Sequence, residues 1–209
     1  MARLRRTRAY VGLGANLGDA AATLTAAVHA LGALPGVRVV GVSRLYATRP
    51  VGPTEQPEFR NAVVALDVPA GPDPATGALT LLVALKRLER AFGRQARARW
   101  GPRELDLDLL VLGRARLSLD RPPQGRSLDA AVAPSVASRL LVVPHPEAAG
   151  RLFVLAPLAD LAPGLVPPGW DLRVATARSR RERIEGPSAV RPIARWDVPG
   201  GRWVPLQPD

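Results

Sequence analysis

The order of strand and helix patterns between residues 9 and 112 constrains the fold of this chain more than any other feature. An apolar run at Ala9–Leu13 ends in a Gly/Asn/Asp turn, and Ala20–Leu31 then has helix formers with apolar residues at helical spacing. The next three segments are a β-branched stretch, a Pro- and Gly-rich loop and a second β-branched stretch, at Val37–Leu45, Thr48–Pro57 and Asn61–Val68. They predict two strands joined by a loop.

The second half of this region repeats the pattern. Asp73-Pro74 is a typical helix start, and an apolar stripe continues to Phe92, where Gly93 ends it. Leu105–Leu112 then has a strand pattern. The order strand, helix, strand, strand, helix, strand is that of the ferredoxin-like βαββαβ core. We therefore predict an α+β fold with an antiparallel sheet flanked by helices in three α-β-α layers.

The 209 residues are enough for one domain with additions, which we assign to residues 1–171. Residues 114–138 are rich in Arg, Pro, Ser and Ala and predict an inserted surface segment with a short helix around Leu128–Val132. A short strand at Leu140–Val143 and a helix at Leu152–Leu161 follow. Residues 172–209 are polar and arginine-rich without a clear core pattern, so we expect a basic tail that is partly ordered or disordered.

Composition limits the chemistry. The absence of cysteine excludes disulfides, thiolate metal sites and cysteine nucleophiles, and His29 and His145 are the only histidines. Any metal should therefore be a hard cation bound by oxygen. No run approaches the roughly 20 apolar residues of a membrane span, and the basic N-terminus lacks a secretory core. We expect a cytoplasmic monomer with no membrane partner.

The net charge of +11 raises the alternative of nucleic-acid binding, here by a ferredoxin-like RNA-binding module. Lys86 is the only lysine, however, and the abundance of Arg, Ala, Pro and Gly is spread along the chain, which indicates a compositional bias rather than a binding stripe. Such a module also needs exposed aromatics on central strands, where we expect an acidic pair instead. We therefore predict no nucleic-acid partner.

The acidic pair is Asp106 and Asp108 in the sequence Glu-Leu-Asp-Leu-Asp-Leu. Because side chains alternate along a strand, the two carboxylates share one face, roughly 7 Å apart along the backbone, and the leucines face the core. Two carboxylates on one face can hold Mg²⁺ in a phosphoryl-transfer site. A solvated strand face is the alternative explanation for an isolated Asp-x-Asp.

The segment before this pair, 94–103, contains four arginines and Trp100. Guanidinium groups match phosphate oxygens, so a triphosphate bridged to Mg²⁺ would account for both signs of charge; a solvated basic loop is the alternative. Gly12 and Gly14 do not form a dinucleotide motif, because Leu17 occupies the place of the third glycine, and no P-loop string occurs. Phosphate binding should therefore use side-chain cations and metal.

At this point the sequence resembles the 6-hydroxymethyl-7,8-dihydropterin pyrophosphokinases of folate biosynthesis. The resemblance covers about residues 9–113 and 139–170 and is densest in four blocks: Tyr10–Gly18, Tyr46–Asn61, Arg99–Asp108 and Val143–Pro146, the last continuing through Arg151–Leu158. It implies transfer of pyrophosphate from ATP to the hydroxymethyl group of the pterin, with AMP as the second product. Another ATP-dependent transferase on the same fold is the remaining alternative.

The resemblance also implies roles for individual residues. Asp106 and Asp108 would bind two Mg²⁺ per active site, and Arg94 and Arg103 would complete the catalytic set. The residues implied around ATP are Lys86, Glu89, Arg94, Arg97, Trp100, Arg103, Arg139, His145 and Arg151. Those implied around the pterin are Thr48, Arg49, Val51, Phe59, Asn61, Trp100 and Phe153.

These assignments have alternatives and departures. Phe59 and Phe153 suit a flat heteroaromatic ring, and Asn61 offers a donor and an acceptor, but core packing and a strand entry explain them equally from the residues alone. The chain departs from the family pattern where Ala96 replaces an arginine, with Arg97 as the nearest substitute. Arg139 also stands one residue farther from Pro144-His145 than the family's equivalent arginine.

Overall fold

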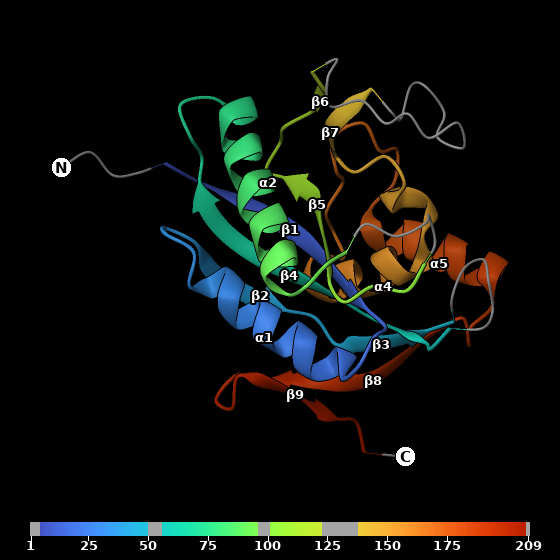
Figure 1. Ribbon diagram of the computed structural model, residues 1–209. Coiled ribbons are helices and arrows are strands. Elements are labelled where there is room, and N and C mark those ends of the chain that lie inside the picture. Colours follow the sequence, from blue (N-terminus) through green and yellow to red (C-terminus); the bar gives the residue numbers. More distant parts are fainter. Residues whose placement is uncertain (1–4, 50–55, 96–100, 123–137, 208–209) are drawn as a thin grey trace.

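A seven-stranded antiparallel sheet forms the centre of the molecule (Figure 1). The computed structural model describes residues 5–49, 56–95, 101–122 and 138–207. The strand order is β5-β1-β4-β3-β8-β9, with β2 also paired to β4. The strands are β1 (Arg6–Ala15), β2 (Arg38–Val42), β3 (Leu45–Thr48), β4 (Phe59–Pro69), β5 (Asp106–Leu112), β8 (Val190–Asp197) and β9 (Arg202–Pro205).

Helices cover both faces of the sheet (Figure 1). The core on one face joins the helices α1 and α2 to alternate residues of β1, β4 and β5, whereas α4 and α5 pack on the other face. The helices are α1 (Ala20–Gly32), α2 (Pro74–Ala91), α4 (Leu152–Leu161) and α5 (Val174–Glu185). The prediction of an α+β fold with a helix-flanked antiparallel sheet is therefore confirmed.

The N-termini of α1 and α2 follow the predicted capping chemistry. Asp19 accepts a hydrogen bond from the Ala22 N–H, and Asp73 accepts one from the Thr76 N–H, each at 2.9 Å. Pro74 stands in the first turn of α2, where its missing N–H costs nothing. These caps define where the two helices begin.

The central pairings bring distant parts of the chain together. On β1, Gly14 lies between Asn61 of β4 and Asp106 of β5, so three residues far apart in sequence share one row. β5 pairs only with β1 among the described strands of this sheet. The acidic pair therefore lies on an edge strand, and our expectation of a central strand was wrong.

The strand predicted at Val37–Leu45 is divided into β2 and β3. Ser43 causes the division: its N–H donates to the Val63 carbonyl, while its Oγ accepts from the Val63 N–H at 2.9 Å. The Ser43 side chain thus accepts a hydrogen bond in place of a backbone carbonyl, and β2 ends before it. β3 is thereby free to pair with β8 as well as with β4.

The residues beyond Leu172 are more ordered than the sequence pattern predicted, because the structure has α5, β8 and β9 there. The buried residues of α5 are Val174 and Ala177, so this arginine-rich helix lacks the apolar stripe that reveals a helix in a sequence. β8 gains its place by pairing with β3, and the buried Trp203 on β9 donates from Nε1 to the Ser43 carbonyl at 2.9 Å. Such long-range pairing leaves little local signal.

Part of the inserted segment forms a small separate sheet. β6 (Leu117–Asp120) pairs with β7 (Arg139–Val143), which includes the predicted strand at Leu140–Val143. The helix predicted around Leu128–Val132 lies outside the described residues. Within the part of the chain that the structure describes, none of the helices combines the length and apolarity needed to cross a membrane.

Candidate active site

Asp106 and Asp108 lie on one face of β5, as the alternation predicted. Leu107 and Leu109, between and after them, are 0% and 3% exposed in the core on the opposite face. The register sets Asp106 opposite Gly14 and Asp108 opposite Gly12. Both partners are glycines, and a pocket lined in part by Gly12, Gly14, Asp106 and Asp108 adjoins the carboxylates.

Two arginines hold Asp106. The Arg94 Nη1 lies 2.8 Å from Asp106 Oδ1, and the Arg103 Nη1 lies 2.7 Å from Oδ2. All three side chains are between 23% and 31% exposed, so the ion pairs stand at the border of solvent. Of the other residues expected in this loop, Arg97 and Trp100 lie outside the described residues.

Glu89 connects the end of α2 to β5. Its carboxylate is 3% exposed and accepts from Lys86 Nζ at 2.7 Å and from the Leu107 N–H at 2.8 Å. Arg94 contacts the same carboxylate. Glu89 therefore orients both cations beside the acidic pair and anchors the backbone between Asp106 and Asp108.

The charge of the Asp108 carboxylate is the least compensated by opposite charges in this site. Burial raises the pKa of its carboxyl, and the neighbouring Asp106 raises it further, while His145 and Lys86 act in the opposite direction. Burial lowers the pKa of His145, which Asp108 partly offsets. A carboxylate pair that repels within a poorly hydrated position favours a bound cation.

The donor set suits a hard divalent cation. The acidic pair supplies carboxylate oxygens, and the described residues contain no group of three or more His, Cys, Asp or Glu that could enclose a metal. Mg²⁺ commonly uses one or two carboxylates and completes its shell with water and substrate phosphates. The residues present therefore fit a Mg²⁺ site that is finished by a phosphorylated ligand.

A cavity of about 120 Å³ opens beside the acidic pair. In it, Asn61 Nδ2 donates to Thr48 Oγ1 at 2.8 Å, and both side chains are buried. The cavity also holds two aromatic rings. Its lining residues are Gly14, Thr48, Arg49, Phe59, Asn61, Gly101, Arg103, Asp106, Asp108, Arg151 and Phe153. The structure thus brings together most residues expected for the pterin and four expected near the phosphates; Val51 lies outside the described residues.

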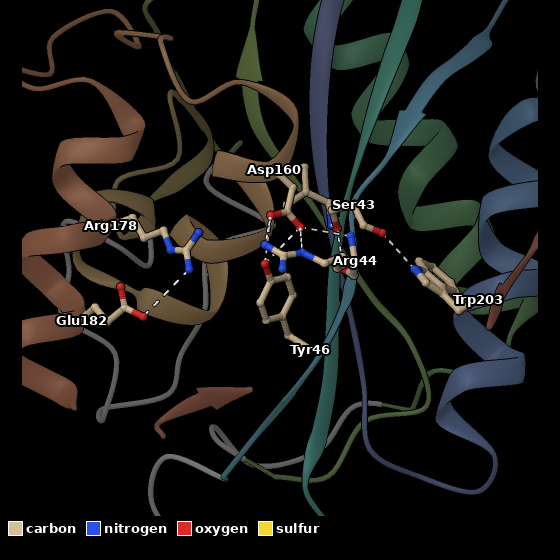
Figure 2. A network of polar contacts seen from close by, with 8 residues as sticks. Ser43, Arg44, Tyr46, Asp160, Arg178, Glu182 and Trp203 are labelled. Atoms are coloured by element: carbon tan, nitrogen blue, oxygen red, sulfur yellow. Dashed lines mark hydrogen bonds and ion pairs between the residues drawn. The ribbon is translucent and has the colours of Figure 1, made fainter. Parts of the chain in front are cut away.

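The start of α4 closes this cavity. Arg151 precedes the helix, and its guanidinium lies 5.7 Å from the ring centre of Phe153 in the first turn. A polar network holds α4 against β3: Asp160 accepts from Arg44 at 2.7 Å and from the Tyr46 hydroxyl at 3.0 Å (Figure 2). The position of Arg151 and Phe153 therefore depends on β3.

Arg139 and His145, which are also expected near ATP, are not among the residues that line this cavity. Arg139 on β7 donates to Ser118 and Asp120, at 2.7 and 2.9 Å. His145 lines a second cavity of about 660 Å³, formed with β6, β7 and residues 168–170. The His145 N–H donates to the Leu110 carbonyl at 2.8 Å, which places this loop beside the end of β5.

Asn16 is a site residue to which the sequence alone assigned no role. It is 2% exposed, its Oδ1 accepts from the Arg103 N–H at 2.7 Å, and its Nδ2 donates to Gln56 and to the Pro57 carbonyl. Asn16 thus fastens the loop that carries Arg103 to the segment that precedes Phe59. The only local signal is its glycine-flanked turn after the first strand.

Comparisons with known proteins give one consistent result. The family described as 7,8-dihydro-6-hydroxymethylpterin-pyrophosphokinase (HPPK) matches residues 10–163. A protein of Methylorubrum extorquens named 2-amino-4-hydroxy-6-hydroxymethyldihydropteridine pyrophosphokinase is 42% identical over 182 residues, which are 86% of this chain and 99% of the relative. A Pseudomonas aeruginosa protein of the same name is 42% identical over 179 residues, with 85% and 95% covered.

The fold also matches solved structures. A crystal structure of Plasmodium falciparum HPPK-DHPS, a triple mutant, superposes with a TM-score of 0.69 at 14% sequence identity. The match covers 97% of this chain and 49% of the other, so this chain spans about half the length of that protein. At this identity the likeness concerns the fold.

Proposed function

This chain belongs to the 7,8-dihydro-6-hydroxymethylpterin-pyrophosphokinase family, and we propose from that premise how its residues divide the reaction. The enzyme transfers pyrophosphate from ATP to the hydroxymethyl group of 6-hydroxymethyl-7,8-dihydropterin, giving the pterin diphosphate and AMP, in folate biosynthesis. The site has two parts. We call Arg94, Arg103, Asp106 and Asp108 the phosphate half, and Thr48, Phe59, Asn61 and Phe153 the pterin half.

In the phosphate half, Asp106 and Asp108 would hold two Mg²⁺. The proposal is supported by the shared face of the carboxylates, the pocket beside Gly12 and Gly14, and the burial and the repulsion by Asp106 that together raise the pKa of Asp108. When bound, the metals would neutralise charge on the phosphate oxygens of ATP. Arg94 and Arg103 already hold one carboxylate, and their remaining N–H groups can donate to phosphate oxygens beside it.

The cations farther from the acidic pair would hold the rest of the nucleotide. Arg151 lines the same cavity as the acidic pair and suits a phosphate contact, whereas Lys86 and Glu89 would support the nucleotide from the end of α2. The charge of Asp108 acts on the His145 imidazole, and this imidazole can donate a hydrogen bond to a phosphate oxygen. Arg139, held by Asp120, is the weakest of these assignments.

The pterin half would bind the flat ring between aromatic faces. Phe59 and Phe153 line the cavity, and the bond from Asn61 to Thr48 fixes the amide so that Oδ1 points toward Gly14. A Cβ added at Gly14 would lie 3.3 Å from that oxygen, so glycine keeps it accessible. The amide can then recognise the polar edge of the ring.

The reaction follows from this arrangement. The pterin hydroxymethyl oxygen attacks the β-phosphorus of ATP in line and loses its proton to solvent as the new oxygen–phosphorus bond forms. The bond between the β-phosphorus and the oxygen that bridges it to the α-phosphorus breaks, and AMP leaves with that oxygen. Holding both substrates beside the acidic pair and its arginines would provide most of the acceleration. The strand order β5-β1-β4-β3, with β2 on β4, supports the ferredoxin-like description of the core.

One observation carries this proposal: the acidic pair and the Asn61–Thr48 pair line one cavity. The test is to incubate the protein with ATP, Mg²⁺ and 6-hydroxymethyl-7,8-dihydropterin and to identify the nucleotide product. We expect AMP, and ADP would contradict pyrophosphoryl transfer. A rise in the melting temperature with the pterin, and none with single-stranded RNA, would exclude the RNA-binding alternative. We also propose that the protein is a monomer.

A further inference from the structure

The C-terminal hairpin, formed by β8 and β9, pairs with the strand that carries Thr48. β3 has four residues, and β8 pairs with it on the side away from β4, with Val190 opposite Thr48 and Arg191 opposite Ala47. Without this hairpin, β3 would be a short edge strand. β8 thus covers the free edge of the strand that carries Thr48, so the hairpin borders the pterin half.

An ion pair crosses β3 at this place. Arg191 Nη2 lies 2.8 Å from Glu58 Oε1 and 3.0 Å from Oε2. Arg60 on β4 contacts the same carboxylate at 3.3 Å, and Ala47 on β3 lies between Arg60 and Arg191 in one row of the sheet. The small Ala47 side chain leaves room for Glu58 to connect the two neighbouring strands.

The electrostatics agree with this geometry. The pKa of Glu58 is held below its usual range, chiefly by the hydrogen bond from Arg191 and then by that from Arg60. The Arg191 side chain is 52% exposed and that of Glu58 is 35% exposed. The pair therefore acts in water, where its contribution is modest and local.

Glu58 directly precedes residues of the pterin half. Phe59 is the first residue of β4 and pairs with Thr48, and Asn61 follows two residues later. Because side chains alternate, Arg60 and Ala47 lie on the face opposite to Thr48 and Asn61. The ion pair thus stands behind the pterin half and acts on it through the backbone.

We propose that Arg191 is a positioning residue for the pterin: through Glu58 it keeps the ends of β3 and β4 in the spacing that Thr48, Phe59 and Asn61 need. The proposal rests on the proposed function. The hairpin has further anchors, since Trp203 donates to Ser43 and His29 Nε2 lies 2.7 Å from the Gly201 carbonyl. Loss of the Arg191 contact therefore leaves β8 in place.

The test compares Arg191→Met with Arg195→Met. Arg195 is an exposed arginine on the same strand, and no ion pair joins it to the described residues, so both variants lose one positive charge. We expect Arg191→Met to raise the KM for the pterin about three- to fivefold, the range of an exposed ion pair, with the KM for ATP and kcat unchanged. Arg195→Met should match the wild type in all three.

Three further variants separate positioning from general structure. Glu58→Gln should raise the pterin KM to the same extent, and adding Arg191→Met to it should have no further effect, because the two residues act as a pair. Arg191→Lys should restore part of the affinity. An unchanged KM for the pterin in Arg191→Met, or an equal rise in the KM for the pterin and the KM for ATP, would overturn this inference. If these variants still form AMP, the proposed function stands. Wild-type protein that makes no AMP would instead overturn the proposed function.

Discussion

In the phosphate half of the active site, charged side chains hold one another, whereas in the pterin half strand pairing and a buried hydrogen bond set the geometry. Arg94, Arg103 and Asp106 are each 23–31% exposed and joined by ion pairs. Thr48 and Asn61 are 6% and 7% exposed and joined by one bond at 2.8 Å. The two halves meet at Gly14, between Asn61 and Asp106.

This difference separates a half that can rearrange from one that is preformed. Ion pairs at the border of solvent contribute little net energy, so arginines can exchange a carboxylate for a phosphate at low cost. Burying an unpaired amide is far more costly, so Asn61 should keep its partner throughout the reaction. The ligands thus complete the phosphate half and enter a pterin half that already exists.

The largest effect is expected for Asp108→Asn. Loss of this carboxylate should lower kcat about 100- to 1,000-fold, because transition-state charge is no longer balanced. Without metal, the melting temperature should stay level or rise, since the substitution removes a negative charge that desolvation and the neighbouring Asp106 both disfavour. Steady-state kinetics and thermal unfolding measure both.

Asp171→Asn is the matched control for that variant. Asp171 is exposed in the loop before α5, and its substitution should change neither kcat nor the melting temperature measurably. Near-normal turnover in Asp108→Asn would remove the metal assignment and with it the contrast between the two halves.

A smaller effect is expected in the pterin half from Thr48→Val. The substitution conserves volume but leaves the buried Asn61 amide without its acceptor, which should raise the pterin KM about tenfold. The KM for ATP should not change. Thr80→Val, on the exposed side of α2, is the control. A parallel rise in both KM values would show that the halves are not independent.

Tyr46→Phe should affect stability more than catalysis. Removal of the hydroxyl deprives Asp160 of a hydrogen bond within the network between β3 and α4 and should cost about 1–3 kcal/mol of unfolding free energy. Tyr10→Phe is the control, because among the described residues Asp160 accepts hydrogen bonds from Arg44 and Tyr46 and none from the Tyr10 hydroxyl. Urea denaturation gives the comparison, and equal losses in both variants would contradict the role of the network.

The smallest effect is expected at Asp67, which also stands between two arginines. Arg38 and then Arg8 lower the pKa of its carboxyl, so the stabilisation is present above its ordinary pKa and is lost as the pH falls through the lowered value. Asp67→Asn should slightly lower the melting temperature at pH 7, with a difference that shrinks as the pH falls below the ordinary pKa of the carboxyl and with no change in kcat. A fall in kcat would mean that arginine-flanked carboxylates matter to catalysis outside the site as well.

The sequence was most informative where chemistry is local. The acidic pair, the arginines before it and the alternation with buried leucines lie within residues 94–109, so one short segment predicts the phosphate half. Apart from the separate strand β3, the strand and helix order up to residue 112 was likewise readable, because periodicity and caps are local signals.

Other features needed the assembled fold. Asn16 acts on Arg103 and Pro57, which are distant in sequence, and no periodicity reveals such contacts. The C-terminal hairpin is positioned by pairing with β3, and its strands carry exposed arginines instead of an alternating pattern. The division into β2 and β3 depended on the hydroxyl of Ser43, which the β-branched stretch concealed.

The most direct test of the phosphate half counts metal ions. Electron paramagnetic resonance can measure protein-bound Mn²⁺, as a substitute for Mg²⁺, in the presence of the pterin and a non-hydrolysable ATP analogue. The wild type should bind two Mn²⁺ per chain, and the Asp106→Asn/Asp108→Asn double variant should lose both while Asp171→Asn retains them. Two Mn²⁺ in the double variant would contradict the assignment of Asp106 and Asp108 as the metal ligands.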